Sequence, residues 1–142
     1  MIDKREKTYQ AFGAFALGFV RDLNHLSGEG WAVLVEGKRD ESALRRLGYT
    51  GRLVTVSSYA RLGGRAFGDS GGVVILTDLD REGSILASRS LKKLLHEGLR
   101  ASLAERRRLK AASKGVFLHV EYLSRFEKEA ESGDGTQDFI TT

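Results

Sequence analysis

The sequence contains no cysteine among its 142 residues. This absence excludes disulfide bonds, thiolate catalysis and zinc sites built from cysteine, and it is typical of a reducing compartment. Long apolar runs are also missing, because polar residues interrupt the hydrophobic ones near the N-terminus at helical spacing. The sequence therefore predicts neither a signal peptide nor a membrane span, and we expect a cytoplasmic protein with no membrane partner.

The composition that is present fits one ordinary domain. Hydrophobic residues make up 41% of the chain, which is enough to build a core. The formal net charge of +4 at pH 7 suits an anionic partner such as nucleic acid. Many basic proteins have no such partner, so the charge favours this interpretation only slightly.

The first part of the chain has the spacing of an amphipathic helix. Between Tyr9 and Leu26 the apolar residues recur at intervals of three and four; they are Phe12, Phe15, Ala16, Phe19, Val20 and Leu23. Such a stripe usually packs on its own domain, and the alternative is a helix that docks on a partner. We expect residues 1–30 to form an N-terminal helix that packs on the domain.

Strand-like and helix-like segments alternate along the rest of the chain. The strands are expected at residues 31–35, 53–56, 73–77 and 116–120, with a short edge strand at 99–101. The helices are expected at residues 40–47 with Asp40 as the cap, 84–96, 102–113 with a capping box of Ser102 and Glu105, and 124–130. The alternation predicts a Rossmann-like, layered α/β domain over residues 31–131, with a mostly parallel sheet of about four strands flanked by helices. Residues 132–142 are polar and are expected to form a flexible tail.

Two further features of the sequence lack the pattern of a functional site. The glycine-rich residues 63–72 do not end in the Gly-Lys-Ser/Thr of a Walker-type phosphate loop, so we expect a flexible spacer there. The histidines show no metal-ligand spacing and are interpreted as structural or surface residues; they are His25, His96 and His119.

Acidic residues follow two of the expected strands. Glu36 comes directly after the first strand, and Asp78 and Asp80 come directly after the third. Because the carboxyl ends of parallel strands form the ligand crevice of an open sheet, these acids can converge there. Asp78 and Asp80 would project on the same side of an extended backbone, and their oxygens suit Mg²⁺. The alternative for this Asp-x-Asp motif is ordinary turn chemistry.

The residues around these acids have expected roles of their own. Glu36 lies beside Gly37, where a ligand can approach the backbone, and crowding with the aspartates would raise its pKa toward the range of a general acid or base. Glu82 is either a further metal ligand or an acid that favours the helix N-terminus. Lys38 and Arg81 could neutralise charge on a phosphate, or form simple salt bridges.

The segments Val-Glu-Gly-Lys-Arg-Asp at 35–40 and Leu-Thr-Asp-Leu-Asp-Arg-Glu-Gly at 76–83 resemble the two signature motifs of the Toprim superfamily. That superfamily includes topoisomerases, bacterial primases, old-family nucleases, recombination-repair proteins and the ribonuclease that matures bacterial 5S ribosomal RNA. The resemblance spans roughly residues 31–120. It implies a Toprim fold in which Glu36 is the general acid/base and Asp78 and Asp80 hold Mg²⁺. Mn²⁺ is the alternative ion, and Glu36 is also expected as a further metal ligand.

Within the superfamily, the Glu-Gly-Lys string with a following Asp resembles the small stand-alone proteins related to the maturation ribonuclease. The Asp-x-Asp-Arg-Glu-Gly string also resembles type I topoisomerases, where another glutamate commonly follows. Ser84 stands there in this sequence, so that carboxylate is missing unless Glu82 replaces it. A topoisomerase also needs further domains with a tyrosine nucleophile, and a primase needs a cysteine zinc module, so a nuclease is the expected class.

We therefore expect Mg²⁺-dependent, endonuclease-like hydrolysis of RNA, with Lys38 assisting Glu36 and the two aspartates. The competing hypotheses are a non-catalytic protein that binds RNA or assembles a complex, and a primase-like or topoisomerase-like subunit that needs a partner protein. For the non-catalytic protein, a basic patch could contact nucleic-acid phosphates; it comprises Arg100, Arg106, Arg107, Arg108 and Lys110. The alternative is a solvated helix face. Lys38 and Arg81, beside the acids, are expected to be further nucleic-acid contacts. Because no aromatic residues lie among these cations, base-specific recognition has no support.

Overall fold

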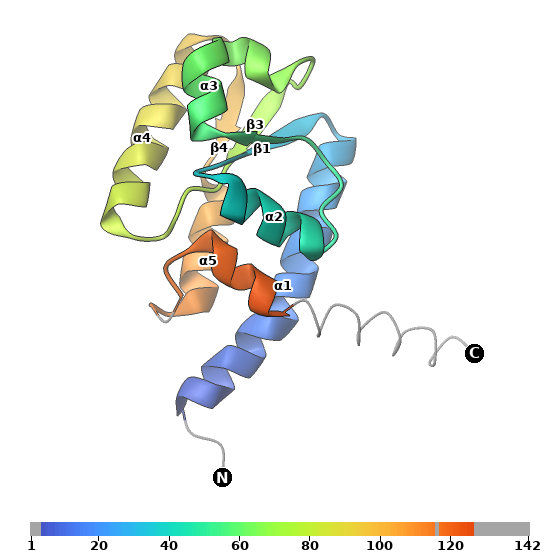
Figure 1. Ribbon diagram of the computed structural model, residues 1–142, viewed down its shortest axis with the longest axis vertical. Coiled ribbons are helices and arrows are strands. Elements are labelled where there is room, and N and C mark those ends of the chain that lie inside the picture. Colours follow the sequence, from blue (N-terminus) through green and yellow to red (C-terminus); the bar gives the residue numbers. More distant parts are fainter. Residues whose placement is uncertain (1–3, 116, 127–142) are drawn as a thin grey trace, which may run out of the picture.

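A computed structural model describes residues 4–115 and 117–126, which form an α/β domain around a four-stranded parallel sheet (Figure 1). The strand order is β2-β1-β3-β4 and every neighbouring pair is parallel. The strands are β1 (Trp31–Val35), β2 (Leu53–Thr55), β3 (Gly72–Ile75) and β4 (Arg100–Ser102). The predicted fold class, a layered α/β domain with a parallel sheet of about four strands, is confirmed.

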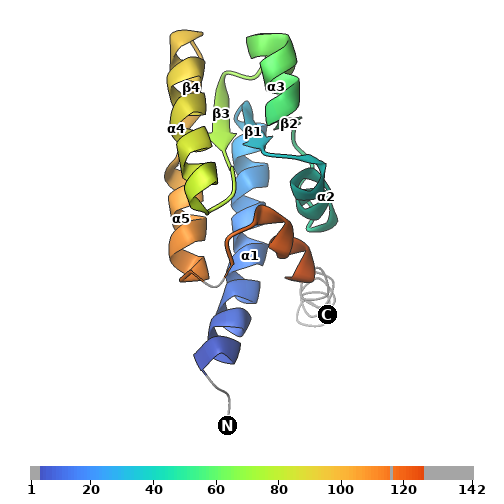
Figure 2. The ribbon, with the colours of Figure 1, turned by 60° about the vertical axis from the view of Figure 1, so that its left-hand side comes forward.

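Helices cover both faces of this sheet (Figure 2). They are α1 (Lys4–Gly28), α2 (Lys38–Arg46), α3 (Val56–Leu62), α4 (Arg81–His96) and α5 (Ala104–Ser113), with 3₁₀ helices η1 (Gly63–Phe67) and η2 (Val120–Phe126). One core cluster joins α1, α2, α5 and η2 to one face, and the other joins α3, η1 and α4 to the opposite face. None of the helices in the described part of the chain is long and apolar enough to cross a membrane.

Strand β1 shows why its sequence is an unbroken apolar run. Ala32 and Leu34 belong to the core under α3 and α4, whereas Val33 and Val35 belong to the core under α1 and α5. Successive side chains of a strand point to opposite faces, so a strand covered on both sides needs apolar residues at every position.

Helix α1 packs on the domain through its apolar stripe, as predicted. Phe12 and Phe19 are buried, and Phe15 lies partly buried against the same core. The ring centroid of Phe12 lies 4.7 Å from that of Phe117 and 5.2 Å from that of Phe126. These aromatic contacts attach residues 117–126 to α1 and so fix the place of a segment that contributes to the site described below.

The two predicted helix caps are wrong in detail. Gly37 is the N-cap of α2, and Asp40 lies inside the first turn, where its Oδ2 accepts a hydrogen bond of 3.0 Å from Gly37 N. Leu103 is the N-cap of α5, and the Ser102 hydroxyl instead accepts a bond of 3.1 Å from Ala104 N and donates one of 2.9 Å to Glu105. Each polar residue still binds the helix start, but from a neighbouring position.

Several other boundaries differ from the predictions. Val56 begins α3 rather than ending a strand, and β3 covers Gly72–Ile75 rather than residues 73–77. The expected spacer at 63–72 contains η1, in which Phe67 is fully buried.

The predicted strand at 116–120 is also wrong for the residues that the structure describes, because 117–119 are irregular and Val120 begins η2. The last helix was expected at 124–130, and its residues 127–130 lie outside the described part, as does the tail at 132–142.

Candidate functional site

The candidate site lies where the carboxyl ends of β1 and β3 meet. From β1 the chain continues to β2 on one side, and from β3 it continues to β4 on the other, so a crevice opens between the two strand ends. Glu36 follows β1 and Asp78 lies three residues after β3. Glu36 Oε1 accepts a hydrogen bond of 3.0 Å from Asp78 N, so the two motifs meet directly.

A histidine completes the cluster. Ligand atoms of Asp78, Asp80 and His119 all lie within 4.8 Å of one another. Asp78 Oδ2 is 3.2 Å from His119 Nδ1, and Asp78 Oδ1 accepts a bond of 2.8 Å from Val120 N. His119 was interpreted as a structural or surface residue, and the structure adds that its ring bonds directly to one of the predicted metal ligands.

The turn that carries both aspartates is held in one conformation. Asp80 is the N-cap of α4, and its Oδ1 accepts a bond of 2.7 Å from Gly83 N. The Thr77 hydroxyl donates a bond of 2.7 Å to Gly83 O. A side chain at Gly83 would overlap the backbone carbonyl of Asp78, so α4 can approach the turn this closely only with glycine at that position.

Arg106 supports the same turn from inside the protein. Only 8% of the residue is exposed. Its guanidinium donates to Thr77 O at 3.2 Å, to Asp78 O at 2.6 Å and to Ser84 Oγ at 3.0 Å. The assignment of Arg106 to a nucleic-acid-binding patch is thus wrong, because its donors bind the turn beneath the acids.

The electrostatics of the cluster favour bound protons or a bound cation. Burial raises the pKa of Glu36, and the charges of Asp78 and Asp80 raise it further against the opposing hydrogen bond from Asp78 N. Burial likewise raises the pKa of Asp40, and Asp78 adds to that shift. The pKa of His119 is raised by its hydrogen bond to Asp78.

The donor set fits a divalent cation. Within the part of the chain that the structure describes, Asp80 Oδ2 and Glu36 Oε2 have no hydrogen-bond partner, while the other oxygen of each carboxylate is held by a backbone N–H. Carboxylate oxygens suit Mg²⁺ and Mn²⁺, and an imidazole extends the choice to softer ions. Glu82 does not join the group: it is exposed in the first turn of α4, as expected of an acid that favours a helix N-terminus.

The predicted cations near the acids lie at the rim of the site. Lys38 is the first residue of α2 and lines a pocket with Glu36, Asp40 and Asp78. Arg81 is exposed at the start of α4.

The remaining cations do not form the single patch that the sequence suggested. Arg107 and Lys110 are exposed on α5, whereas Arg108 forms an ion pair of 3.0 Å with Asp22 on α1. The guanidinium of Arg100 lies over the ring of Trp31, 4.9 Å from its centroid. Trp31 begins β1 and Arg100 begins β4, so both lie at the amino-terminal ends of the parallel strands. The acids lie at the opposite, carboxyl-terminal ends.

Fold and site together define a layered α/β protein with an acidic centre at the switch point of a parallel sheet. No protein-family profile matches the chain. A UPF0292 protein from Methanosarcina barkeri is 38% identical over 104 residues, which cover 72% of this chain and 73% of that protein. Another, from Methanosarcina acetivorans, is 32% identical over 116 residues, which cover 80% and 81%. The chain therefore belongs to the UPF0292 family, a name that carries no assigned activity.

A solved structure of a protein from Aquifex aeolicus also resembles this chain. The TM-score is 0.63 at 26% sequence identity, and the match covers 74% of this chain and 94% of that one. The similarity supports the layered α/β fold, and the name of that protein adds no activity.

Proposed function

We propose that this protein is a metal-dependent phosphodiesterase that hydrolyses nucleic acid, with RNA favoured over DNA. The observation that carries the proposal is the cluster of Asp78, Asp80 and His119 within 4.8 Å, next to the Glu36 carboxylate. The resemblance of both acidic motifs to those of the Toprim superfamily supports it. Mg²⁺ is the proposed ion and Mn²⁺ the alternative, and a nucleic-acid substrate suits a cytoplasmic enzyme.

The side chains divide the work of hydrolysis. A bound divalent ion would polarise the phosphate and lower the pKa of a water molecule. Asp78 and Asp80 would hold that ion, with His119 as a further ligand or as the group that orients Asp78. Glu36 has a raised pKa and a carboxylate oxygen without a partner in the described residues, which suits it to accept and return a proton. Lys38, at the rim, would offset charge on the phosphate.

A cleavage assay tests this proposal. Structured RNA, single-stranded DNA and duplex DNA would each be incubated with and without Mg²⁺ or Mn²⁺. We expect metal-dependent cleavage of RNA, which falls at least about 100-fold in Glu36→Gln and in Asp78→Asn/Asp80→Asn. Asp69→Asn, an exposed aspartate outside the site, is the matched control and should cleave like the parent. Equal cleavage by the parent and the double variant would contradict the assignment.

A second function, RNA binding or complex assembly without hydrolysis, is favoured by one observation. Arg107 and Lys110 are exposed on α5, and neither forms an ion pair among the described residues. Salt-sensitive RNA binding that survives in Asp78→Asn/Asp80→Asn, with no cleavage by the parent under any ion, would support this alternative. A requirement for a partner protein would appear as cleavage that is restored by cell extract.

A further inference from the structure

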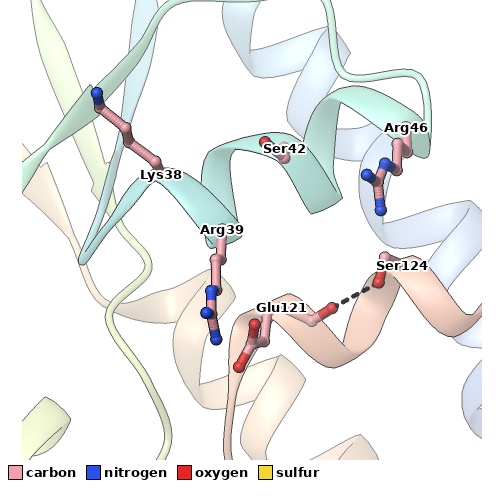
Figure 3. A pocket seen from close by; sticks show the side chains of 6 residues that line it. All are labelled: Lys38, Arg39, Ser42, Arg46, Glu121 and Ser124. Atoms are coloured by element: carbon pink, nitrogen blue, oxygen red, sulfur yellow. Dashed lines mark hydrogen bonds between the residues drawn. The ribbon is translucent and has the colours of Figure 1, made fainter.

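A second pocket lies beside the acidic one, between α2 and η2 (Figure 3). It has a volume of about 380 Å³ and is lined by Lys38, Arg39, Ser42, Arg46, Glu121 and Ser124. This volume falls at the lower end of the range for ligand pockets, so there is room for a phosphate with its attached sugar. Lys38, Ser42 and Arg46 are four residues apart along α2, and this spacing places them on one face of the helix.

The pocket carries positive charge that forms no ion pair with the residues the structure describes. In the described part of the chain, Lys38, Arg39 and Arg46 form no ion pair. The neighbouring Arg45 differs, because its guanidinium donates to Tyr49 O at 3.0 Å and to Gly51 O at 2.7 Å. Three cations therefore line a pocket with one lining carboxylate, that of Glu121, so the lining carries net positive charge that attracts an anion.

The two pockets adjoin each other. Lys38, Arg39 and Glu121 line both, and the acidic pocket adds Glu36 and Asp78. An extended chain with one phosphate at the acids would therefore pass directly over the start of α2. A planar guanidinium and a hydroxyl are both groups that proteins use to contact backbone phosphates.

We propose that this basic pocket binds a backbone phosphate of a nucleic-acid strand, next to the phosphate held at the acids. Arg46 and Ser42 contact this second phosphate, and Lys38 and Arg39 lie between the two. The inference rests on the proposed function, because it assigns the path of the same substrate. Binding of the strand along α2 would then be independent of the base sequence, since only phosphates are contacted.

The test is equilibrium binding of a labelled single-stranded RNA oligonucleotide to the full chain, in Ca²⁺ and at several salt concentrations. Arg46→Gln removes one pocket cation, and Arg89→Gln is the matched control on α4, where Arg89 is exposed and forms no ion pair in the described residues. We expect Arg46→Gln to weaken binding about 3- to 5-fold. The slope of log K against log salt should become shallower by about 0.7, the value for one phosphate contact on a single strand.

A phosphate-by-phosphate scan sharpens this test. On an oligonucleotide just long enough to span the acids and the basic pocket, so that it cannot slide, one neutral methylphosphonate linkage should weaken binding to the parent when it occupies the pocket. Arg46→Gln and Ser42→Ala should lose that particular sensitivity and keep the sensitivity at other positions. An equal change of slope in Arg46→Gln and Arg89→Gln, or stronger binding of inorganic phosphate than of the oligonucleotide, would overturn the assignment.

Failure of the proposed function is distinguishable from failure of this inference. RNA binding that depends on Arg46, with no cleavage under any ion, would contradict the hydrolase and leave the pocket assignment standing. Metal-dependent cleavage that is unchanged in Arg46→Gln, with an unchanged salt slope, would contradict the pocket and leave the hydrolase standing. Circular dichroism of each variant shows whether the overall helix content is retained.

Discussion

Replacing Arg106 tests whether this residue belongs to the turn or to a nucleic-acid surface. The change Arg106→Gln removes the charge and the guanidinium fork but keeps a polar side chain of similar helix propensity. In the structure the fork makes three hydrogen bonds, to the carbonyls of Thr77 and Asp78 and to the hydroxyl of Ser84. The shorter amide cannot reach all of these acceptors.

The expected loss of stability follows from those acceptors. Thr77 is fully buried, so its carbonyl oxygen would lose its partner without replacement by water, which costs about 1–3 kcal/mol. The Asp78 carbonyl is partly buried and would add a smaller cost of the same kind. We therefore expect Arg106→Gln to lower the free energy of unfolding by about 2–4 kcal/mol.

Urea denaturation measures this free energy directly. Arg107→Gln is the control, because Arg107 is the next residue on the same helix and is exposed. The free energy of unfolding of this variant should differ from that of the parent by no more than about 0.5 kcal/mol. The Arg106→Gln variant should bind RNA as well as the parent under conditions in which it is folded, and more weakly only under conditions in which it begins to unfold. Equal stability of the two variants, with weaker RNA binding in Arg106→Gln, would refute the buried role and restore Arg106 to the binding surface.

Three further outcomes are expected. Gly83→Ala should lower the melting temperature and weaken metal binding, because its side chain would overlap the Asp78 carbonyl; Gly18→Ala, which meets nothing within 4 Å, should leave both intact or raise stability. Phe12→Ala should cost about 3–5 kcal/mol in urea denaturation and speed hydrogen exchange at Val120 N. His119→Ala should weaken Zn²⁺ binding more than Mg²⁺ binding in calorimetric titrations; equal losses would mean that His119 only orients Asp78.

The parts of the fold that could be predicted are those with one dominant local signal. The run Trp31–Val35 has no polar residue, and its strand was predicted with the observed bounds. The stripe from Phe12 to Leu23 has a clear helical period and is buried as expected. Helix α3 was missed because its signals conflict: Thr55 caps it by accepting from Ser58 N, yet Thr55 and Val56 are also strand formers.

In the site, the acids could be predicted from the sequence, but His119 and Arg106, which bond to the turn that carries the aspartates, could not. Glu36 and Asp78 could be placed together because parallel strands end at one edge of a sheet. His119 lies 41 residues from Asp78, in an irregular segment whose place depends on aromatic packing against α1, and no spacing rule carries that information. Arg106 was misread because a helical pattern does not show which arginine of three in a row points inward.

The most direct test of the central claim, that these acids form a metal centre, is Mn²⁺ binding followed by electron paramagnetic resonance. Free Mn²⁺ gives a strong signal that is lost on binding, so the remaining signal measures the free ion. A titration therefore gives the number of sites and their affinity in the parent and in its variants. We expect binding by the parent and by Asp69→Asn, and its loss in Asp78→Asn/Asp80→Asn. Binding of Mn²⁺ to the double variant as tightly as to the parent, or no binding by the parent, would contradict the metal centre.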